Sequence, residues 1–535
     1  MKRNRKIATI LLAALLCLTM TLPALGEGVA FPLAETLEVT YWAPMRSNVA
    51  RSISTFAEAE LYTYLEEMTN IHLTFTHPTL GEEDTAFNLL LARTPLPDVI
   101  EYDYGGYTGG ASQALADGII MDVSDLIPVY MPNFNKYLES MPELRQKFGT
   151  PDGAYGYFPF IRDPEVSLVN AGMIIRADLL AQTGLSMPTT IDELHDVLVA
   201  LKENTDVKYP MLISDTALSR SIWNDQGRVF TGAWDIVMTY FQDNGVVKYG
   251  PYEPAYKDMM TTLHQWYEEG LLETEFTAIN SGTALESGIF GGDWAVFSQN
   301  IGPMEKMVSE GQKLNPEFAV TGMPPLTLEA GGSNRMISTM ETVPLDNNNY
   351  GLAISSTCDP AKVPAILAMI DYGYGEAGSL LYSIGQENVC YTVDEDGNYA
   401  FTDLMINNPA GVAKTDYWYR YCRGNDGGAY VLRTTEFANL YWSLPMQVEA
   451  TAAWTSQMDA YTANPWRLNG VVDTDTASRI AEKQVDIDSY VKEMFVKFLT
   501  GTESLDNFDA YLKTLESMGI QSIISDYQTA EDAAK

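Results

Sequence analysis

The stretch that decides the fold class is Leu37-Glu-Val-Thr-Tyr-Trp42, followed by Ile71-His-Leu-Thr-Phe75 and Pro97-Asp-Val-Ile100. The first two segments alternate apolar and polar residues, which is typical of β-strands, and the third opens a further strand. Between them, residues 50–68 and 84–93 carry apolar side chains at helical spacing. The order strand, helix, strand, helix, strand predicts parallel pairing and an α/β fold.

The rest of the chain continues this mixture of strands and helices. We expect further strands at 155–160, 167–175, 294–297 and 350–355, and helices at 176–180, 194–201, 257–270 and 363–372. Thr190 and Glu193 form a capping box at the start of one of these helices. Two apolar stripes, at 487–498 and 505–515, predict two helices in the C-terminal tail.

Length and composition describe a large folded protein with an acidic surface. The chain has 535 residues, of which 46% are hydrophobic and only 19% charged, which excludes a disordered or fibrous protein. Its 71 acidic residues against 33 Lys and Arg give a formal net charge of −38. Such a surface repels phosphate backbones and anionic lipids, so we expect no nucleic-acid partner.

The first residues predict export from the cytoplasm. Four Lys and Arg residues precede an apolar run from Ile7 to Leu22, and small residues follow it. This pattern is typical of a secretory signal peptide, which we assign to residues 1–26. Cys17 leaves lipid anchoring open as an alternative to free secretion, although Leu16 is larger than the residue that usually precedes a lipidated cysteine. Either way the protein is expected outside the cytoplasmic membrane.

Motifs for cofactors and metals are weak. Gly373-Tyr-Gly375-Glu-Ala-Gly378 matches the dinucleotide-binding pattern but follows a predicted helix instead of a strand, so we interpret it as a helix end and turn. Residues 394–398 resemble part of a calcium loop, yet both terminal ligands of that motif are wrong, and a hairpin turn is the better interpretation. We therefore expect no cofactor and no metal site. The pairing of Cys358, Cys390 and Cys422 stays open.

Aromatic residues beside polar ones are more informative. A flat ring next to carboxylate or guanidinium groups suits a sugar, because the ring stacks on C–H groups while the polar groups bind hydroxyls. Ligands of open α/β sheets lie beyond the carboxyl ends of strands. On these grounds we predict eight ligand-binding residues: Trp42, Arg46, Asp103, Tyr104, Asp293, Trp294, Trp418 and Arg420.

Several segments, in this order and spacing, resemble one known family. The most specific runs from Ile174-Ile-Arg-Ala-Asp178 through Gly184-Leu185 to Pro188-Thr-Thr190. The other matching segments are Leu96–Val99, Gly118–Ile127, Tyr155–Pro159, Gly292–Val296, Tyr372–Asn388, Phe508–Ile520 and Gln528–Ala530. Together they resemble the extracellular solute-binding proteins of bacterial ABC importers, in the carbohydrate-linked lipoprotein branch of Gram-positive bacteria. The poor lipobox at Cys17 and Gln386-Glu-Asn388 depart from that branch.

The resemblance implies a type II periplasmic-binding fold, with two α/β lobes and a ligand cleft between them. We expect lobe one at 36–162 and 316–388, and lobe two at 163–315 and 389–535. It also implies a monomer that captures a carbohydrate, of the size of an oligosaccharide, and delivers it to the transmembrane subunits of an ABC permease, without enzymatic activity. The alternatives are a secreted glycoside hydrolase or lyase, or a binding protein for peptides or other solutes, because one fold serves many functions.

Overall fold

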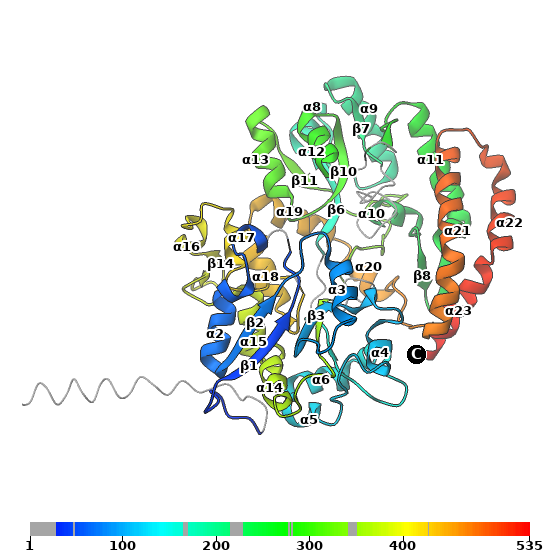
Figure 1. The fold of residues 1–535 in the computed structure, drawn as a ribbon. Coiled ribbons are helices and arrows are strands. Elements are labelled where there is room, and N and C mark those ends of the chain that lie inside the picture. The colour runs from blue at the N-terminus through cyan, green and yellow to red at the C-terminus, as the bar shows by residue number, and fades with distance from the viewer. Residues whose placement is uncertain are drawn as a thin grey trace, which may run out of the picture. The chain divides into compact units, whose positions relative to one another are not determined.

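The protein folds into two compact units, each built from discontinuous sequence (Figure 1). The computed structural model describes residues 28–46, 49–163, 169–213, 228–276, 279, 282–340, 350–425 and 427–535. Unit 1 comprises Met1–Pro164 and Thr342–Leu440, and unit 2 comprises Glu165–Glu341 and Tyr441–Lys535. The predicted signal peptide at residues 1–26 lies outside the described residues.

The boundaries of the units differ from the lobe boundaries that we predicted. The first boundary lies two residues from the expected crossing after 162, but the other two follow 341 and 440 instead of 315 and 388. Strand pairing explains both shifts. Strand β11 (Val320–Gly322) pairs with β6 (Ala171–Arg176), which keeps it in unit 2. Strand β15 (Val431–Leu432) pairs with β5 (Ile161–Arg162), which keeps it in unit 1.

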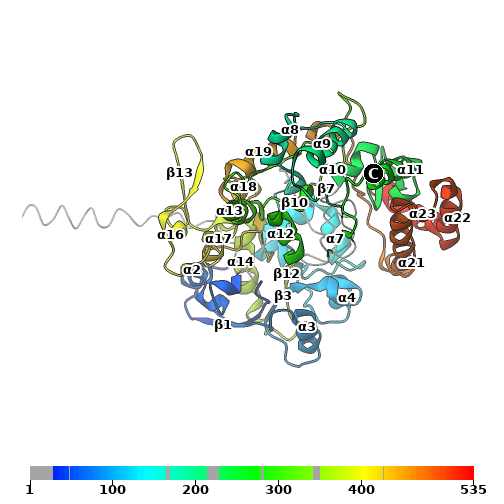
Figure 2. The same ribbon diagram turned by 90° about the horizontal axis from the view of Figure 1, so that it is seen from above.

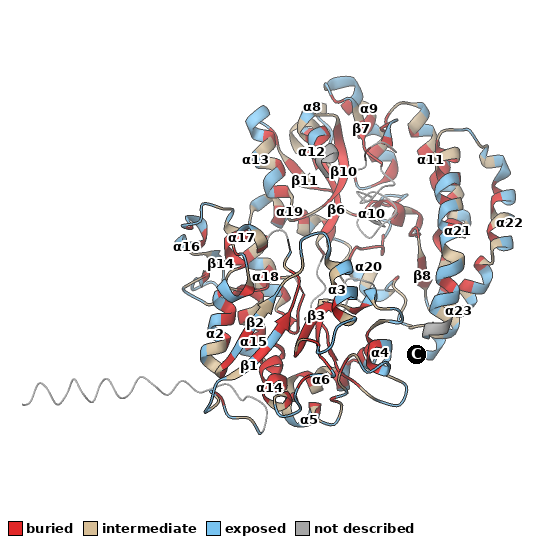
Figure 3. Cartoon of the chain, viewed as in Figure 1, coloured by how far each residue is buried: buried red, intermediate tan, exposed pale blue. Residues whose placement is uncertain are grey.

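Unit 1 is organised around a five-stranded mixed sheet with the order β2-β1-β3-β12-β4. Its strands are β1 (Leu37–Trp42), β2 (Ile71–Thr76), β3 (Val99–Asp103), β4 (Tyr157–Phe158) and β12 (Tyr350–Ile354). Strand β1 is parallel to β2 and β3, as the sequence predicts, while β12 is antiparallel to both β3 and β4. Figure 3 shows the buried residues concentrated in these strands.

The helices of unit 1 come from both of its sequence segments. They are α2 (Glu60–Thr69), α3 (Glu83–Leu91), α4 (Gly110–Ala116), α5 (Ile127–Tyr130), α6 (Pro132–Ser140), α7 (Pro142–Phe148), α14 (Val363–Tyr374), α15 (Glu376–Ile384), α16 (Asp403–Ile406), α17 (Lys414–Trp418) and α18 (Thr434–Tyr441). The predicted helix at 50–68 begins only at Glu60, because short 3₁₀ turns occupy 49–51 and 56–58. Helix α14 is apolar on nearly all sides and is correspondingly buried on all sides.

The glycine motif at 373–378 joins two packed helices, as we interpreted it. Gly375 ends α14 and caps the start of α15. A Cβ atom on Gly378 would lie 1.8 Å from the carbonyl oxygen of Tyr372, and one on Gly373 would lie 2.5 Å from that of Ala429. These glycines are therefore required by close backbone packing.

Asp371, on α14, caps the amino end of α6 from outside that helix. Its carboxylate accepts hydrogen bonds from the backbone N–H groups of Phe134 (2.8 Å) and Asn133 (3.3 Å) and from the Asn133 amide (2.9 Å). The side chain of Met131 at the N-cap cannot do this. Asp371 is only 1% exposed. Burial raises the pKa of its carboxyl to about 6, although the three N–H donors lower it.

This pKa predicts a pH dependence of stability. Aspartate has an ordinary pKa of about 3.9, so the folded chain holds a proton at Asp371 over a range in which the unfolded chain has lost it. The stability from that proton is present below about pH 4 and is lost as the pH rises through about 6. Asp371→Asn removes the titration. The unfolding free energy of the wild type relative to this variant should fall by roughly 2–3 kcal/mol between pH 4 and pH 7. Urea unfolding at a series of pH values measures it, and parallel stability curves would contradict it.

Unit 2 has a smaller sheet with the order β11-β6-β10-β7, plus a β8–β9 hairpin. The remaining strands are β7 (Tyr209–Met211), β8 (Tyr240–Asp243), β9 (Val246–Tyr249) and β10 (Trp294–Asn300). The helices are α8 (Ala177–Thr183), α9 (Ile191–Asn204), α10 (Arg228–Thr231), α11 (Pro254–Glu268), α12 (Gly282–Gly291), α13 (Met304–Leu314), α19 (Pro445–Trp454), α20 (Met458–Ala463), α21 (Thr474–Leu499), α22 (Phe508–Met518) and α23 (Ile520–Ala533).

The helices of unit 2 follow the sequence signals closely. Both bonds of the predicted capping box between Thr190 and Glu193 are present at the start of α9. Helix α21 contains the first predicted apolar stripe. The second stripe begins in a 3₁₀ turn at Leu505 and continues in α22, and α23 adds a third tail helix that we did not predict. These three helices lie together at one side of unit 2 (Figures 1 and 2).

Residues 391–401 form the predicted hairpin. Strands β13 (Tyr391–Val393) and β14 (Tyr399–Phe401) are antiparallel. Oδ1 of Asp394 accepts hydrogen bonds from the backbone N–H groups of Asp396 (3.0 Å) and Asn398 (2.9 Å). The carboxylate of Asp394 thus stabilises the turn, which confirms the hairpin interpretation of this segment.

Candidate functional site

One edge of the sheet in unit 1 brings together the carboxyl ends of its three parallel strands. Strands β2, β1 and β3 are parallel, so their carboxyl ends lie at the same edge. Strand β12 runs in the opposite direction, and its first residue, Tyr350, pairs with Asp103, the last residue of β3. In open α/β folds this is the edge where ligands bind.

A hollow of about 420 Å³ lies at this edge. That volume is within the range of small-molecule sites, about 300–1,000 Å³. It is lined by Asp84, Phe87, Asn88, Tyr102, Asp103, Gly105, Gly106 and Tyr350. The lining combines aromatic rings, carboxylates and an amide, which are the groups that bind the C–H faces and hydroxyls of sugars.

The polar groups of the hollow are held in defined positions. The Tyr102 hydroxyl donates to Oδ1 of Asp84. Oδ1 of Asp103 accepts from the backbone N–H of Gly105 at 2.9 Å, which caps a short 3₁₀ turn, Tyr104–Gly106. Each bond holds its carboxylate in a defined orientation at the hollow.

The aromatic wall is centred on Tyr102 and Tyr350. Their ring centroids are 5.6 Å apart in an edge-to-face arrangement, and the ring of Phe87 lies 4.4 Å from that of Tyr102. The guanidinium of Arg46 lies 5.1 Å from the centroid of the Tyr350 ring. Burial raises the pKa of Tyr350; Arg46 lowers it, and the nearby carboxylates, Asp103 among them, add to the rise.

Gly427 and Gly428 pack closely against the backbone and Cβ atom of Tyr350. Gly427 has a φ of +87°, and a Cβ atom there would lie 2.6 Å from the Cβ atom of Tyr350. The N–H of Gly428 donates to the carbonyl oxygen of Tyr350 at 2.5 Å. Only glycine fits this approach, which fixes the backbone of Tyr350 at the hollow.

Of the eight residues that we predicted to bind ligand, Asp103 lines this hollow and Arg46 lies against its Tyr350. Trp42 and Tyr104 lie close to it but behind its wall. Trp42 is 4% exposed and packs on Tyr102 and Phe87, while Tyr104 is 2% exposed and packs on Phe87. Their rings are enclosed by other aromatic side chains, so the predicted stacking role is corrected to support of the wall.

Trp418 and Arg420 are elsewhere in unit 1. Trp418 is completely buried, and its Nε1 donates to the carbonyl oxygen of Ile384 at 2.9 Å. Nη1 of Arg420 donates to the carbonyl oxygen of Ser52 at 3.4 Å. Trp418 is therefore a core residue, which corrects its predicted role as a sugar platform.

Asp293 and Trp294 belong to unit 2. Trp294 begins β10, at the opposite end of the strand from the carboxyl end where ligands are expected. It is 3% exposed, and its Nε1 donates to Oε2 of Glu273 at 2.9 Å. The carbonyl oxygen of Asp293 accepts from the N–H of Tyr209 at 2.9 Å. Trp294 therefore packs inside unit 2, contrary to its predicted stacking role.

Sequence reasoning missed Tyr350, Asp84 and Asn88. The strand beginning at 350 was expected, but its pairing with β3 across about 250 residues was not. Asp84 and Asn88 are four residues apart on α3, and this spacing places both on one helix face. Two polar residues at this spacing were visible in the sequence. Such pairs are common on exposed helices, so the spacing alone does not identify a binding site.

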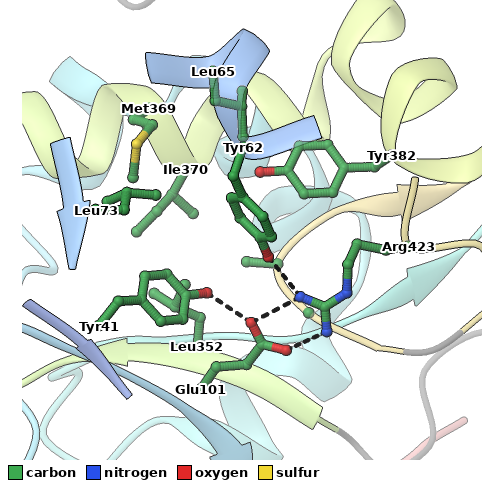
Figure 4. A pocket seen from close by; sticks show the side chains of 12 residues that line it. Tyr41, Tyr62, Leu65, Leu73, Glu101, Leu352, Met369, Ile370, Tyr382 and Arg423 are labelled. Atoms are coloured by element: carbon green, nitrogen blue, oxygen red, sulfur yellow. Dashed lines mark hydrogen bonds and ion pairs between the residues drawn. The ribbon is translucent and has the colours of Figure 1, made fainter. Parts of the chain in front are cut away.

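A second enclosed space in unit 1 is too small for a solute. About 20 Å³ in volume, it adjoins Glu101, Arg423, Tyr41 and Tyr62 (Figure 4). Such a space holds about one water molecule. Arg423 binds both carboxylate oxygens of Glu101, at 2.5 and 3.2 Å, and its Nη1 also donates to the Tyr62 hydroxyl at 2.7 Å.

Tyr41 completes this buried polar cluster. Its hydroxyl donates to Oε2 of Glu101 at 2.6 Å. Burial raises the pKa of Tyr62 to about 12, with Arg423 acting against the rise. At neutral pH both tyrosines are therefore neutral and surround the ion pair between Arg423 and Glu101. It ties β3 to the loop that contains Arg423, and we assign it a structural role.

A larger surface hollow, of about 590 Å³, lies between α2 and the edge strand β2. Its charged groups include Glu66 and His72, which pair with each other at 2.9 Å. It follows the side of the sheet and not the carboxyl ends of the strands. We therefore regard the hollow at Asp103 as the better candidate.

Metal and membrane features were also sought in the described part of the chain. There, no group of three or more His, Cys, Asp or Glu side chains is placed to hold a metal ion. Within the same residues, every helix is too short or too polar to cross a membrane. No disulfide joins Cys358, Cys390 and Cys422, and all three are buried.

The chain belongs to the family of bacterial extracellular solute-binding proteins, whose pattern it matches over residues 51–379. One relative is the fructooligosaccharide ABC transporter substrate-binding protein FusA of Streptococcus pneumoniae, 33% identical over 181 residues. That match spans about a third of each chain. Another is the polygalacturonan/rhamnogalacturonan-binding protein YtcQ of Bacillus subtilis, 22% identical over 485 residues and 88% of each chain.

Solved structures share the fold. An HMO-binding, ABC-transporter-associated solute-binding protein from Bifidobacterium longum infantis has a TM-score of 0.68 and 18% identity, covering 93% of this chain and 99% of its own. FusA of Streptococcus pneumoniae in complex with kestose has a TM-score of 0.65 and 20% identity, with the same coverage. The alginate-binding protein AlgQ2 without calcium has a TM-score of 0.64 and 21% identity, covering 95% of this chain and 100% of its own.

Proposed function

We propose that this protein binds an oligosaccharide outside the cytoplasmic membrane and delivers it to the permease of an ABC importer. The observation that carries the proposal is the hollow at the carboxyl end of β3, where Tyr102 and Tyr350 face a space shared with Asp84 and Asp103. Membership of the solute-binding family and the sugar ligands named for its relatives support it. Binding without catalysis is part of the proposal.

The proposed mechanism is that of a two-lobed binding protein. The hollow of unit 1 would supply a sugar-binding surface, and hinge closure would follow ligand binding. Closure needs a ligand that has a higher affinity for the closed than for the open form. The closed monomer is then recognised by the permease. Export fits this role, by either a signal peptide at 1–26 or, as the alternative, a lipoprotein signal that ends at Cys17.

Calorimetric titration with neutral oligosaccharides, uronate oligosaccharides and peptides tests the proposal. Tyr350→Ala should weaken binding of the best oligosaccharide about 3–10-fold, because an aromatic face contributes about 0.5–1.5 kcal/mol beyond its buried area. Tyr64→Ala is the matched control, since Tyr64 is an exposed tyrosine of α2 in the same unit and does not line the hollow. It should leave affinity unchanged.

Three outcomes would contradict the proposal. Equal affinities of the Tyr350 and Tyr64 variants would remove the hollow as the site. Binding of peptides but no saccharide would refute the ligand class. Steady release of shortened saccharides would indicate a glycoside hydrolase or lyase.

A further inference from the structure

A buried tyrosine, Tyr157, connects the two strands that carry the aromatic wall of the hollow. Its hydroxyl donates to the carbonyl oxygen of Tyr102 at 3.0 Å and accepts from the N–H of Gly351 at 2.8 Å. Tyr102 belongs to β3 and Gly351 to β12, and the two residues are direct partners in the sheet register. The next pair along the ladder is Asp103 with Tyr350, at the hollow itself. The hydroxyl therefore bridges β3 and β12 beside the pair that ends the ladder.

Gly351 leaves the space that this bridge needs. Tyr157, on β4, lies opposite Ala353 of β12, and its side chain reaches the backbone of Gly351, two residues along that strand. A Cβ atom on Gly351 would lie 2.5 Å from Cζ and 2.6 Å from the hydroxyl oxygen of Tyr157. Any other residue at position 351 would therefore displace the ring that carries the hydroxyl.

The ring of Tyr157 is enclosed by other aromatic side chains. It lies 4.8 Å from the ring of Phe148 and 5.4 Å, edge-to-face, from that of Tyr104. Tyr157 is 1% exposed and does not line the hollow, so a ligand there does not touch it. Burial raises the pKa of its hydroxyl, which therefore keeps at neutral pH the proton that it donates to Tyr102.

From this arrangement we propose that Tyr157 is a positioning residue for the sugar-binding hollow. Its hydroxyl holds β3 and β12 at the separation that places the rings of Tyr102 and Tyr350 5.6 Å apart before a ligand arrives. The inference rests on the proposed carbohydrate-binding function and adds a residue that acts on affinity without touching the sugar. Groups that are ordered before binding give higher affinity, because less freedom is lost when the ligand binds.

Tyr157→Phe tests the proposal, because it removes the hydroxyl and keeps the ring. The buried carbonyl of Tyr102 and N–H of Gly351 then lose their shared partner, and the strands must shift to satisfy them. Calorimetric titration with fructo-, xylo-, manno- and galacto-oligosaccharides and with oligogalacturonides identifies the tightest of these ligands. Tyr157→Phe should weaken binding of that ligand about threefold or more, which is within the contribution of an aromatic face.

Two control variants accompany this measurement. Tyr155 is fully buried two residues before Tyr157, and its hydroxyl has no hydrogen-bond partner among the described residues, so Tyr155→Phe should leave the affinity unchanged. Trp418→Phe loses the hydrogen bond to the carbonyl oxygen of Ile384, at a residue that does not line the hollow. It should lower the stability of the protein and leave the affinity of the folded molecules unchanged.

A double-mutant cycle with Tyr350→Ala separates positioning from a general structural effect. The separation of two rings does not affect the ligand once one ring is absent. Tyr157→Phe should therefore change the affinity less than about 1.5-fold in the Tyr350→Ala background, so that the two effects are not additive. A purely structural effect would reduce the affinity equally in both backgrounds.

The possible results distinguish this inference from the proposed function. If Tyr350→Ala weakens binding but Tyr157→Phe does not, or if Tyr157→Phe has the same effect in both backgrounds, the positioning role is wrong and the sugar-binding hollow stands. If no saccharide binds, or if Tyr350→Ala leaves the affinity unchanged, the hollow is not the sugar site and both proposals fail.

Discussion

Arg423→Met should lower the free energy of unfolding of the protein by about 3–5 kcal/mol, because it leaves the carboxylate of Glu101 buried without a cation. Glu101 is 1% exposed and Arg423 is 6% exposed. Two hydrogen bonds, at 2.5 and 3.2 Å, connect them (Figure 4). The Tyr41 hydroxyl also donates to Glu101, and Arg423 also donates to the Tyr62 hydroxyl. Urea unfolding followed by circular dichroism measures the change.

The controls for this prediction use a second ion pair and a double variant. Lys313 pairs with Glu310 at 2.6 Å, and both side chains are exposed, at 65% and 40%, so Lys313→Met should cost only about 0–1 kcal/mol. Replacing both Glu101 and Arg423 by apolar residues of similar volume should recover most of the loss, because no charge then stays buried. A loss below about 1 kcal/mol for Arg423→Met would show that the pair does not act as we describe.

Trp418→Ala should destabilise the protein by about 3–5 kcal/mol without changing the sugar affinity of the molecules that remain folded. The indole is fully buried, lies 5.9 Å from the ring of Phe437 and donates to the carbonyl oxygen of Ile384. The substitution leaves a large cavity and an unpaired carbonyl group. Thermal unfolding and calorimetric titration of the same preparation measure the two quantities.

Trp418→Phe is the matched variant for this prediction. It keeps most of the apolar volume and loses only the hydrogen bond, so its cost should be clearly smaller. The sequence alone suggested that Trp418 stacks on a sugar. If the alanine variant kept its stability but lost affinity, that earlier interpretation would be right and the core assignment wrong.

The contrast between Asp103 and the tryptophans shows how far site prediction from sequence can go. Asp103 was found because it lies at the carboxyl end of a strand, and in a parallel sheet that end must lie at the ligand edge. Trp294 and Trp418 were selected by chemistry alone, since a large ring beside polar residues suits a sugar, whereas Trp42 was selected also for its place at a strand end. The same rings also fill cores, and 0–4% exposure shows that Trp42, Trp294 and Trp418 do so.

Local signals in the sequence determined the strands β1, β2 and β3, the capping box at Thr190, the hairpin at 391–401 and the α/β class. Each depends on residues close together in the chain, whose spacing and turn chemistry act without distant partners. The prediction of export rests on the N-terminal pattern, and the net negative charge follows from composition. These features required no knowledge of how distant segments meet.

Only the tertiary structure decided which distant segments pair. The extent of unit 1 depends on β15 pairing with β5, and the hollow depends on Tyr350 pairing with Asp103. Burial then separated rings that support the wall from those that line the hollow. The physical reason is that pairing and burial are sums over contacts between residues far apart in sequence, whereas periodicity and capping are properties of a few neighbouring residues.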